Sequence, residues 1–172
     1  MGLLVERLSK SDAFELFNFE SENKDFFEKS VPPRSKDYYD YNKFLIILDS
    51  LLDEQNKGES YFYLIKNEVG SILGRINIVD IDRANGHGYL GYRIGYPNTR
   101  KGIASHALKL LLNMLIQENS ITQLSAKTTS DNFGSQKVLE KNGFKVIEPN
   151  NDPIKKMNDQ KGDFIYYHWI LI

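Results

Sequence analysis

The sequence predicts an α/β protein with a mixed central β-sheet flanked by helices, and three observations support this. Segments typical of strands and of amphipathic helices are interspersed along all 172 residues. Their order is strand, two helices, three strands, helix, strand, helix and two strands. Neither an internal repeat nor a linker divides the chain, so we expect a single domain over residues 1–172.

The N-terminal part opens with a short apolar strand at residues 3–8. Ser9 or Ser11 is then a suitable N-cap for a helix rich in phenylalanine. Val31 and two prolines interrupt the chain. Apolar residues at three- and four-residue spacings predict a second helix over residues 35–54.

Three strands follow, each bounded by turn-forming residues. The first two are expected at residues 61–66 and 71–80, and the third at residues 87–95. A turn-like Asn-Glu-Val-Gly sequence separates the first two strands, and an Asp-Arg-Ala-Asn-Gly sequence precedes the third.

The clearest helix is expected to begin just after Gly102 and to run to about Glu118, because it carries a continuous apolar stripe. A strand at residues 121–127 and a short helix at residues 132–142 come next. Gly143 is suited to the left-handed position that ends a helix, which would let Phe144 fold back on Leu139.

The remaining chain predicts a short extended segment at residues 145–147, a polar loop at residues 148–162 and a terminal strand at residues 163–172.

Composition narrows the possible functions. The chain has no cysteine, which excludes disulfides, a thiolate nucleophile and cysteine-ligated metals. The net charge of −1 argues against general nucleic-acid binding, and no apolar run approaches the length of a membrane span. We therefore expect a cytoplasmic protein that binds neither nucleic acid nor membrane.

Charge is unevenly distributed along the chain. Residues 1–60 hold 8 Lys and Arg against 13 Asp and Glu, whereas residues 61–172 hold 14 against 10. This asymmetry could suit an anionic cofactor together with a cationic substrate, although ordinary surface charge explains it as well.

One motif is misleading. Residues 86–91 match the dinucleotide fingerprint G-x-G-x-x-G, but that motif requires a strand that turns into a helix. Here it follows a turn and leads into a strand, so we do not expect a dinucleotide site.

The better candidate for an anion site is the start of the long helix. Unpaired N–H groups at a helix N-terminus can hold a pyrophosphate. Gly102, Ala104 and Ser105 leave room for a ligand, and Arg100 and Lys101 add positive charge.

Three segments together resemble the GNAT superfamily of acyl-CoA-dependent N-acetyltransferases. They are Tyr92-Arg93-Ile94-Gly95, then Arg100-Lys101-Gly102-Ile103-Ala104, and a stretch from Asn132 that ends in Lys141-Asn142-Gly143-Phe144. The branch most similar is that of the ribosomal-protein N-terminal (Rim-type) acetyltransferases, and the resemblance covers nearly the whole chain. It implies a single-domain GNAT fold.

The resemblance also implies how acetyl-CoA would bind. The family's pyrophosphate turn would fall on Thr99, Arg100, Lys101, Gly102, Ile103 and Ala104, with Ser105 beside it. The end of the preceding strand, around Ile94 and Tyr96, would pair with the pantetheine arm. Asn132 matches an asparagine that contacts CoA in the family, and a plain helix N-cap is the less favoured alternative for it.

Catalysis in the family is direct attack of an amine on the thioester, without a covalent enzyme intermediate. Many relatives protonate the leaving thiolate with a tyrosine seven residues after the asparagine, where this chain has Leu139. Rim-type members have a serine three residues after it, and Ser135 matches that position. The general base stays open: Asp80, His87 and His168 are candidates by chemistry alone, and water could suffice.

The resulting prediction is an N-acetyltransferase that moves acetyl from acetyl-CoA to a primary amine, most simply a protein or peptide N-terminus. A small-molecule amine such as an amino-sugar or polyamine is the alternative acceptor. A non-catalytic acyl-CoA-binding module and a nucleotide-binding regulatory domain are the rivals outside the enzyme class. We expect no metal, because the three histidines lack the spacing of a ligand set, and a homodimer is possible as in relatives.

Overall fold

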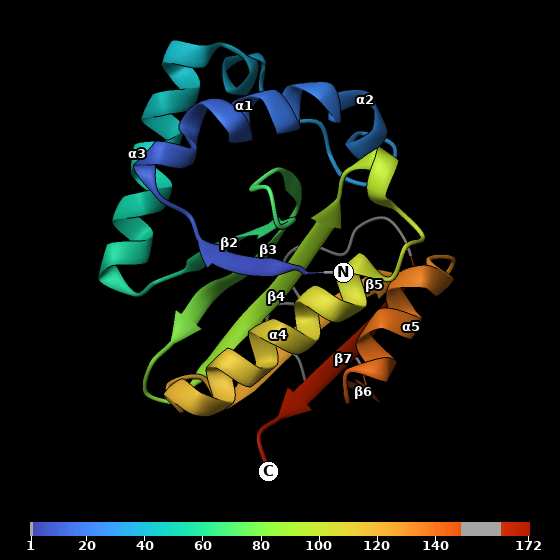
Figure 1. Cartoon of the computed structure of the whole chain (residues 1–172). Coiled ribbons are helices and arrows are strands. Elements are labelled where there is room, and N and C mark those ends of the chain that lie inside the picture. The colour runs from blue at the N-terminus through green and yellow to red at the C-terminus, as the bar shows by residue number, and fades with distance from the viewer. Residues whose placement is uncertain (1, 149–162) are drawn as a thin grey trace.

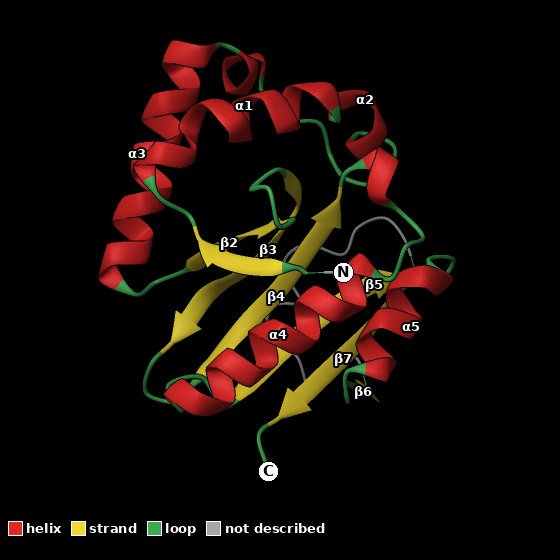
Figure 2. Cartoon of the chain, viewed as in Figure 1, coloured by secondary structure: helices red, strands yellow, loops and turns green. Residues whose placement is uncertain are grey.

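The computed structural model describes residues 2–148 and 163–172, whose strands form one seven-stranded mixed sheet (Figures 1 and 2). The strand order is β1-β2-β3-β4-β5-β7-β6. The strands are β1 (Leu4–Arg7), β2 (Tyr61–Lys66), β3 (Ile72–Asp82), β4 (His87–Ile94), β5 (Gln123–Thr129), β6 (Lys145–Ile147) and β7 (Phe164–Ile170). The helices are η1 (Lys10–Asp12), α1 (Ala13–Glu22), α2 (Lys24–Phe27), η2 (Lys36–Tyr39), α3 (Tyr41–Lys57), η3 (Tyr96–Asn98), α4 (Ile103–Glu118) and α5 (Phe133–Lys141).

Two helical layers cover the sheet, as Figure 1 shows: α4 crosses its front with α5 beside it, and α1, α2 and α3 gather at the top of the view. Strand β2 is buried on both sides because Tyr63 and Ile65 enter the core under α4, whereas Phe62 and Leu64 enter the core under α1 and α3. The α/β architecture expected from the sequence is therefore confirmed.

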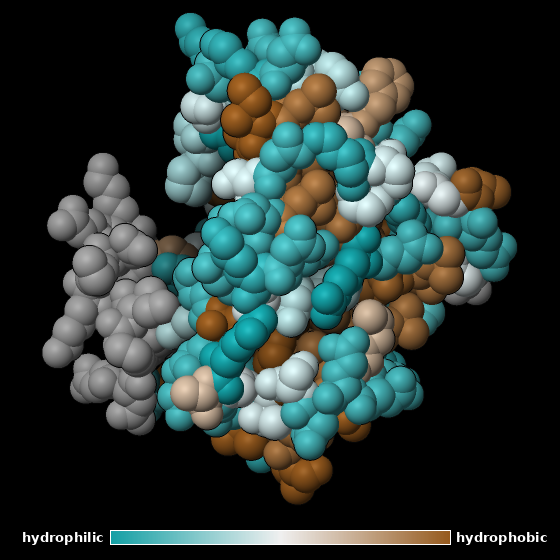
Figure 3. Space-filling view, turned by 90° about the vertical axis from the view of Figure 1, so that its left-hand side faces the viewer, coloured by the Kyte–Doolittle hydropathy of each residue, from teal (hydrophilic) through white to brown (hydrophobic). Residues whose placement is uncertain are grey.

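The face of the molecule on which α3 lies is largely polar. Seen from the side on which α3 lies, hydrophilic side chains cover most of the molecule (Figure 3). In the described part of the chain, no helix combines the length and the apolarity that a membrane span requires.

The helix predicted over residues 35–54 begins later than its apolar pattern indicated. Residues 36–39 form the separate 3-10 turn η2, and α3 begins at Tyr41. Asp40 causes the break, because its backbone is extended and its side chain accepts a hydrogen bond from the Lys43 amide at 3.1 Å. Gly58, in the left-handed conformation, ends the helix.

Other boundaries shift by a few residues. Strand β5 covers Gln123–Thr129 instead of residues 121–127, and β3 extends to Asp82. The short helix α2 was not expected. The loop predicted at residues 148–162 lies outside the described residues from residue 149 onward.

Strands β4 and β5 are paired at one end only. They run parallel, and their register covers only His87–Tyr89 against Gln123–Ser125. Beyond Tyr89, β4 remains paired with β3 as far as Ile94, and β5 remains paired with β7 as far as Thr129. The two strands therefore part, and within residues 2–148 and 163–172 no strand pairs with the β4 edge from Leu90 to Ile94 on the β5 side. We call this opening the seam.

The end of α5 confirms the predicted glycine cap. Gly143 has a φ of 83°, and the Phe144 amide donates to the Leu139 carbonyl at 3.1 Å. Phe144 and Leu139 are both buried, which ties α5 to the core.

We predict opposite effects on stability for two glycine-to-alanine changes in this segment. Gly143→Ala should lower the free energy of unfolding by about 1–2 kcal/mol, because an L-residue is strained at positive φ while its Cβ would have adequate space, 3.8 Å from Trp169. Gly134→Ala, inside α5, should raise it by up to about 1 kcal/mol through helix propensity. Thermal unfolding should resolve both, at about 2–4 °C per kcal/mol. Equal shifts would contradict the assignment of Gly143 as the cap.

Candidate active site

The first turn of α4 is free to bind an anion. Gly102 is its N-cap, with a φ of 76°, and has no side chain that could cap the helix. The first bond inside the helix runs from the His106 amide to the Gly102 carbonyl, so the amides of Ile103, Ala104 and Ser105 precede it. These amides and the helix dipole attract negative charge.

The approach to this turn is open and positively charged. A Cβ built on Gly102 would meet nothing within 4 Å. Arg100 and Lys101 are exposed, and Arg100 itself adopts a left-handed backbone with a φ of 61°. A pyrophosphate therefore fits here sterically and electrostatically.

Residues 96–99, which connect the end of β4 to the start of α4, are held by a hydrogen bond within the segment and by contacts with the junction of α1 and α2. The Thr99 hydroxyl donates to the Tyr96 carbonyl at 2.9 Å, which closes η3. The Tyr96 amide donates to Oδ1 of Asn23 at 2.8 Å, and its ring, 65% exposed, contacts Phe26 with the centroids 5.1 Å apart. The end of β4 thus lies beside α2, as Figure 1 also shows.

Asn132 is the N-cap of α5. Its Oδ1 accepts a hydrogen bond from the Ser135 amide at 3.1 Å. The capping role is therefore present, and Nδ2 of the exposed side chain is not used by this bond. Contact with CoA stays a prediction for Asn132.

Ser135 lies at the seam, where its hydroxyl is 2.8 Å from the hydroxyl of Tyr92 on β4. The Tyr92 hydroxyl also donates to the Ser135 carbonyl at 3.3 Å. Tyr92 lies on the part of β4 that has separated from β5, and Ser135 lies in the first turn of α5. The hydroxyl pair therefore bridges the strand and the helix that border the seam. Ser135 therefore stands where a proton could be delivered through a two-hydroxyl chain.

Tyr92 is the residue that sequence reasoning did not single out. In the sequence it belongs to the Tyr92-Arg93-Ile94-Gly95 segment, whereas the family's usual tyrosine acid would fall at position 139. Leu139 is only 1% exposed and packs in the core. Strand alternation, which turns Tyr92 toward α5, was the available signal.

Burial is the main reason why the pKa of Tyr92 is raised to about 12, and the hydrogen bond with Ser135 opposes this shift. The hydroxyl therefore keeps its proton at neutral pH and can donate it.

The three candidate bases lie elsewhere. His87 begins β4, five residues from Tyr92 and thus about 17 Å away along the strand. His168 pairs with Ser125 at the closed end of the seam, and Asp80 lies in the irregular end of β3. None of them flanks the Tyr92–Ser135 pair.

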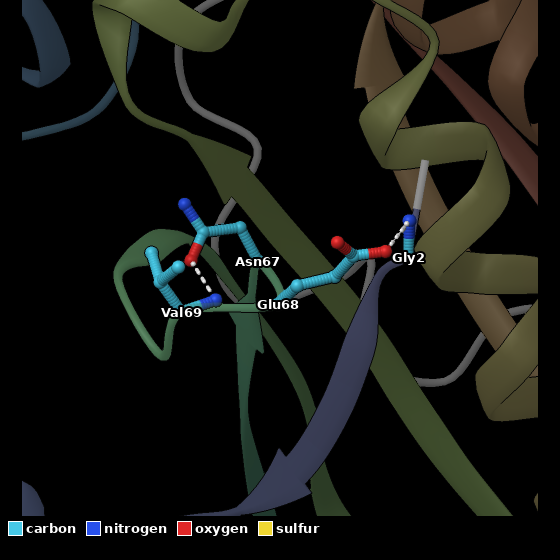
Figure 4. Close-up of a pocket in the computed structure, with 4 residues that line it drawn as sticks. All are labelled: Gly2, Asn67, Glu68 and Val69. Atoms are coloured by element: carbon cyan, nitrogen blue, oxygen red, sulfur yellow. Dashed lines mark hydrogen bonds between the residues drawn. The ribbon is translucent and has the colours of Figure 1, made fainter.

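A surface hollow between the start of β1 and the β2–β3 turn does not belong to this site. Figure 4 shows Gly2, Asn67, Glu68 and Val69 around it. The Glu68 carboxylate accepts from the Gly2 amide at 3.1 Å, and Asn67 closes the turn with the Val69 amide. Its polar groups are thus used within the protein.

Among the residues that the structure describes, no group of three or more His, Cys, Asp or Glu side chains could hold a metal ion.

Solved structures with this architecture are acetyltransferases. The ribosomal-protein-S5-alanine acetyltransferase of Vibrio fischeri superposes with a TM-score of 0.84 at 19% identity, over 99% of this chain and 93% of that one. RimL, a ribosomal L7/L12 α-N-protein acetyltransferase in complex with coenzyme A, gives 0.82 at 19% identity, over 98% and 94%. The fold class is thus that of these transferases.

Sequence comparison gives the family. The model of the acetyltransferase (GNAT) domain matches residues 3–145. The probable N-acetyltransferase YjcK of Bacillus subtilis (strain 168) is 29% identical over 144 residues, 83% of this chain and 80% of that protein. The [ribosomal protein uS5]-alanine N-acetyltransferase of Escherichia coli (strain K12) is 26% identical over 144 residues, 83% and 74%. The chain belongs to the GNAT acetyltransferase family, and it is an acetyl-CoA-dependent N-acetyltransferase.

We predict that Tyr92→Phe reduces the loss of stability at alkaline pH. The folded state keeps the Tyr92 proton up to a pKa of about 12, whereas an unfolded tyrosine loses it near pH 10. The free energy of unfolding should therefore be highest below about pH 10 and fall as pH rises toward about 12, by about 1.4 kcal/mol per pH unit for this group.

Urea unfolding at about pH 9 and about pH 11 should show a smaller drop for Tyr92→Phe than for the wild type. Tyr96→Phe, at an exposed ring, should keep the wild-type drop. An unchanged drop in Tyr92→Phe would show that the Tyr92 hydroxyl titrates normally.

Proposed function

We propose that this chain transfers an acetyl group from acetyl-CoA to the α-amino group of a protein or peptide N-terminus. The observation that carries the proposal is the seam, which connects the uncapped start of α4 to the Tyr92–Ser135 hydroxyl pair. Acetyl-CoA is an extended molecule whose anionic pyrophosphate would lie at the start of α4 and whose thioester would lie at the Tyr92–Ser135 pair.

In this proposal, the chain binds acetyl-CoA mainly with backbone groups. The amides from Gly102 to Ser105 receive the pyrophosphate, and Arg100 and Lys101 add charge. The free edge of β4 near Ile94 pairs with the pantetheine arm as an added strand would. Thr99 and Tyr96 hold the connecting turn, and Asn132 borders the arm from α5.

The bound thioester supplies an activated carbonyl. The amine nitrogen forms a bond to the carbonyl carbon, and the carbon–sulfur bond breaks as the amide forms. Ser135 protonates the leaving sulfur and is resupplied by Tyr92, whose raised pKa keeps the proton available. The proton released by the amine passes to water, and Tyr92 regains a proton from water, so that both hydroxyls return to their starting state.

An N-terminal amine is favoured as the acceptor because none of the three candidate bases lies beside the Tyr92–Ser135 pair. An α-amino group has a pKa of about 7.7–8.0, so a useful fraction is already neutral at pH 7, whereas a lysine-like amine needs a strong base. Asp80, His87 and His168 all lie away from the hydroxyl pair. Relatives that acetylate a ribosomal-protein alanine support the same choice.

A cytoplasmic location and a homodimer remain part of the proposal.

We predict that acetyl-CoA stabilises the protein against heat. At 100 times its Kd, a ligand adds about 2.7 kcal/mol, which corresponds to roughly 5–10 °C for a domain of this size. ATP and NAD serve as controls and should give no comparable shift. Absence of a shift with saturating acetyl-CoA would contradict the cofactor assignment.

We predict that Ser135→Ala lowers kcat by about 10²-fold and leaves acetyl-CoA binding within a small factor of wild type. The loss reflects the missing proton donor, because the cofactor is held elsewhere. Release of free thiol during peptide acetylation measures kcat, and calorimetry measures binding. Ser120→Ala, at an exposed position near the end of α4, is the matched control.

Unchanged turnover in Ser135→Ala would remove this serine from the mechanism. If the wild type binds acetyl-CoA and no peptide or small amine in a broad panel accelerates CoA release, the chain is a binding module instead.

A further inference from the structure

A buried ionic cluster joins the N-terminal helices to the sheet. Glu20 of α1 accepts from Nη1 of Arg75 on β3 at 2.7 Å, and its Oε1 is 3.3 Å from Nη2 of Arg93 on β4. Arg75 also donates to the Tyr38 hydroxyl at 3.1 Å. The side chains of Glu20, Arg75 and Arg93 are 1%, 4% and 20% exposed, so Arg93 is the member that reaches solvent.

This cluster borders the seam on the side opposite to α5. Arg93 follows Tyr92 directly, and successive side chains of a strand point to opposite faces. Tyr92 faces Ser135, whereas the Arg93 guanidinium lies over the Phe27 ring, 4.7 Å from its centroid. If the cofactor occupies the α4 and α5 side, as in the proposed function, the amine acceptor arrives past Arg93.

The cluster carries more positive than negative charge. One carboxylate, that of Glu20, faces two guanidinium groups, and the excess charge resides at the more exposed Arg93. Among the described residues, the only ion pair of Arg93 is the one with Glu20, and a guanidinium has five N–H donors.

Further cations surround the cluster. The Arg34 guanidinium lies 4.2 Å from the centroid of the Tyr38 ring, and Lys24 lies 4.8 Å from that of Tyr39. Glu20 and Glu28 are the acidic residues that act on Tyr39. Although residues 1–60 are acidic as a whole, the fold thus gathers cations around this cluster.

We propose that Arg93 recognises a carboxylate on the acceptor, so that the preferred N-terminus carries Asp or Glu at its second or third residue. An extended peptide advances about 3.3 Å per residue, so the second or third side chain of an acceptor lies several ångströms beyond its reacting amine and can meet a group on the face of β4 opposite to Tyr92. Charge-assisted, fork-shaped hydrogen bonds of a guanidinium suit a carboxylate. This inference rests on the proposed function.

The test compares matched peptides that differ only at the second or third residue: Asp against Asn, and Glu against Gln. The wild type should acetylate the acidic peptides with a kcat/KM about tenfold higher, mainly through KM. Arg93→Gln should remove this preference while keeping the rate on neutral peptides. Arg83→Gln, at the distant β3–β4 turn, should keep the preference.

Removal of Arg93 could destabilise the buried Glu20, so Arg93→Lys is the second variant. It keeps the charge without the fork, and its acid preference should be reduced but present. A merely structural role for Arg93 would alter stability and leave the ratio of acidic to neutral rates unchanged.

Equal rates for acidic and neutral peptides in the wild type would overturn this inference and leave the proposed function standing. Absence of acetylation of any peptide would overturn both. The comparison also includes a peptide with phosphoserine at the second residue. A higher rate of acetylation of this peptide than of the Asp and Glu peptides would overturn the carboxylate assignment in favour of phosphate.

Discussion

The parting of β4 and β5 is the constraint on which the rest of this molecule depends. Each strand keeps its hydrogen bonds on its outer side, β4 with β3 and β5 with β7, so the two can separate beyond Tyr89 without disrupting the sheet. The separation leaves backbone donors and acceptors of β4 without a strand partner, which is an arrangement that an extended ligand can complete. Helices α4 and α5 begin beside this opening, so a helix N-terminus and the Ser135 hydroxyl meet at the same place.

The two sides of the opening carry different chemistry because neighbouring residues of one strand point to opposite faces. Tyr92 contributes a hydroxyl of raised pKa toward α5, and Arg93 contributes a guanidinium toward α1. The Glu20 carboxylate makes the burial of Arg75 tolerable, since buried charges need partners, and it fixes α1 against β3 and β4. The cluster therefore has a structural role in addition to the recognition role proposed for Arg93.

Much of the fold could be predicted from the sequence, because hydrophobic periodicity and turn residues are local signals. The helix from Gly102 to Glu118, the cap at Gly143 and the rejected G-x-G-x-x-G match at residues 86–91 all follow from such signals, and the structure agrees with them. The start of α3 was missed because Asp40 competes as an N-cap with an apolar pattern that begins earlier. The ionic cluster of Glu20, Arg75 and Arg93 could not be read from the acidity of residues 1–60, since a sum over sequence does not say which charges become neighbours.

The sequence by itself determined most of the order of elements, the glycine at the start of α4 and the resemblance to GNAT acetyltransferases, because each of these depends on residues close together in the chain. Only the tertiary structure decided that Tyr92 meets Ser135 across 43 positions and that Glu20 meets Arg75 across 55. Contacts at such separations arise from strand register and from the packing of helices on the sheet, and no local pattern encodes them.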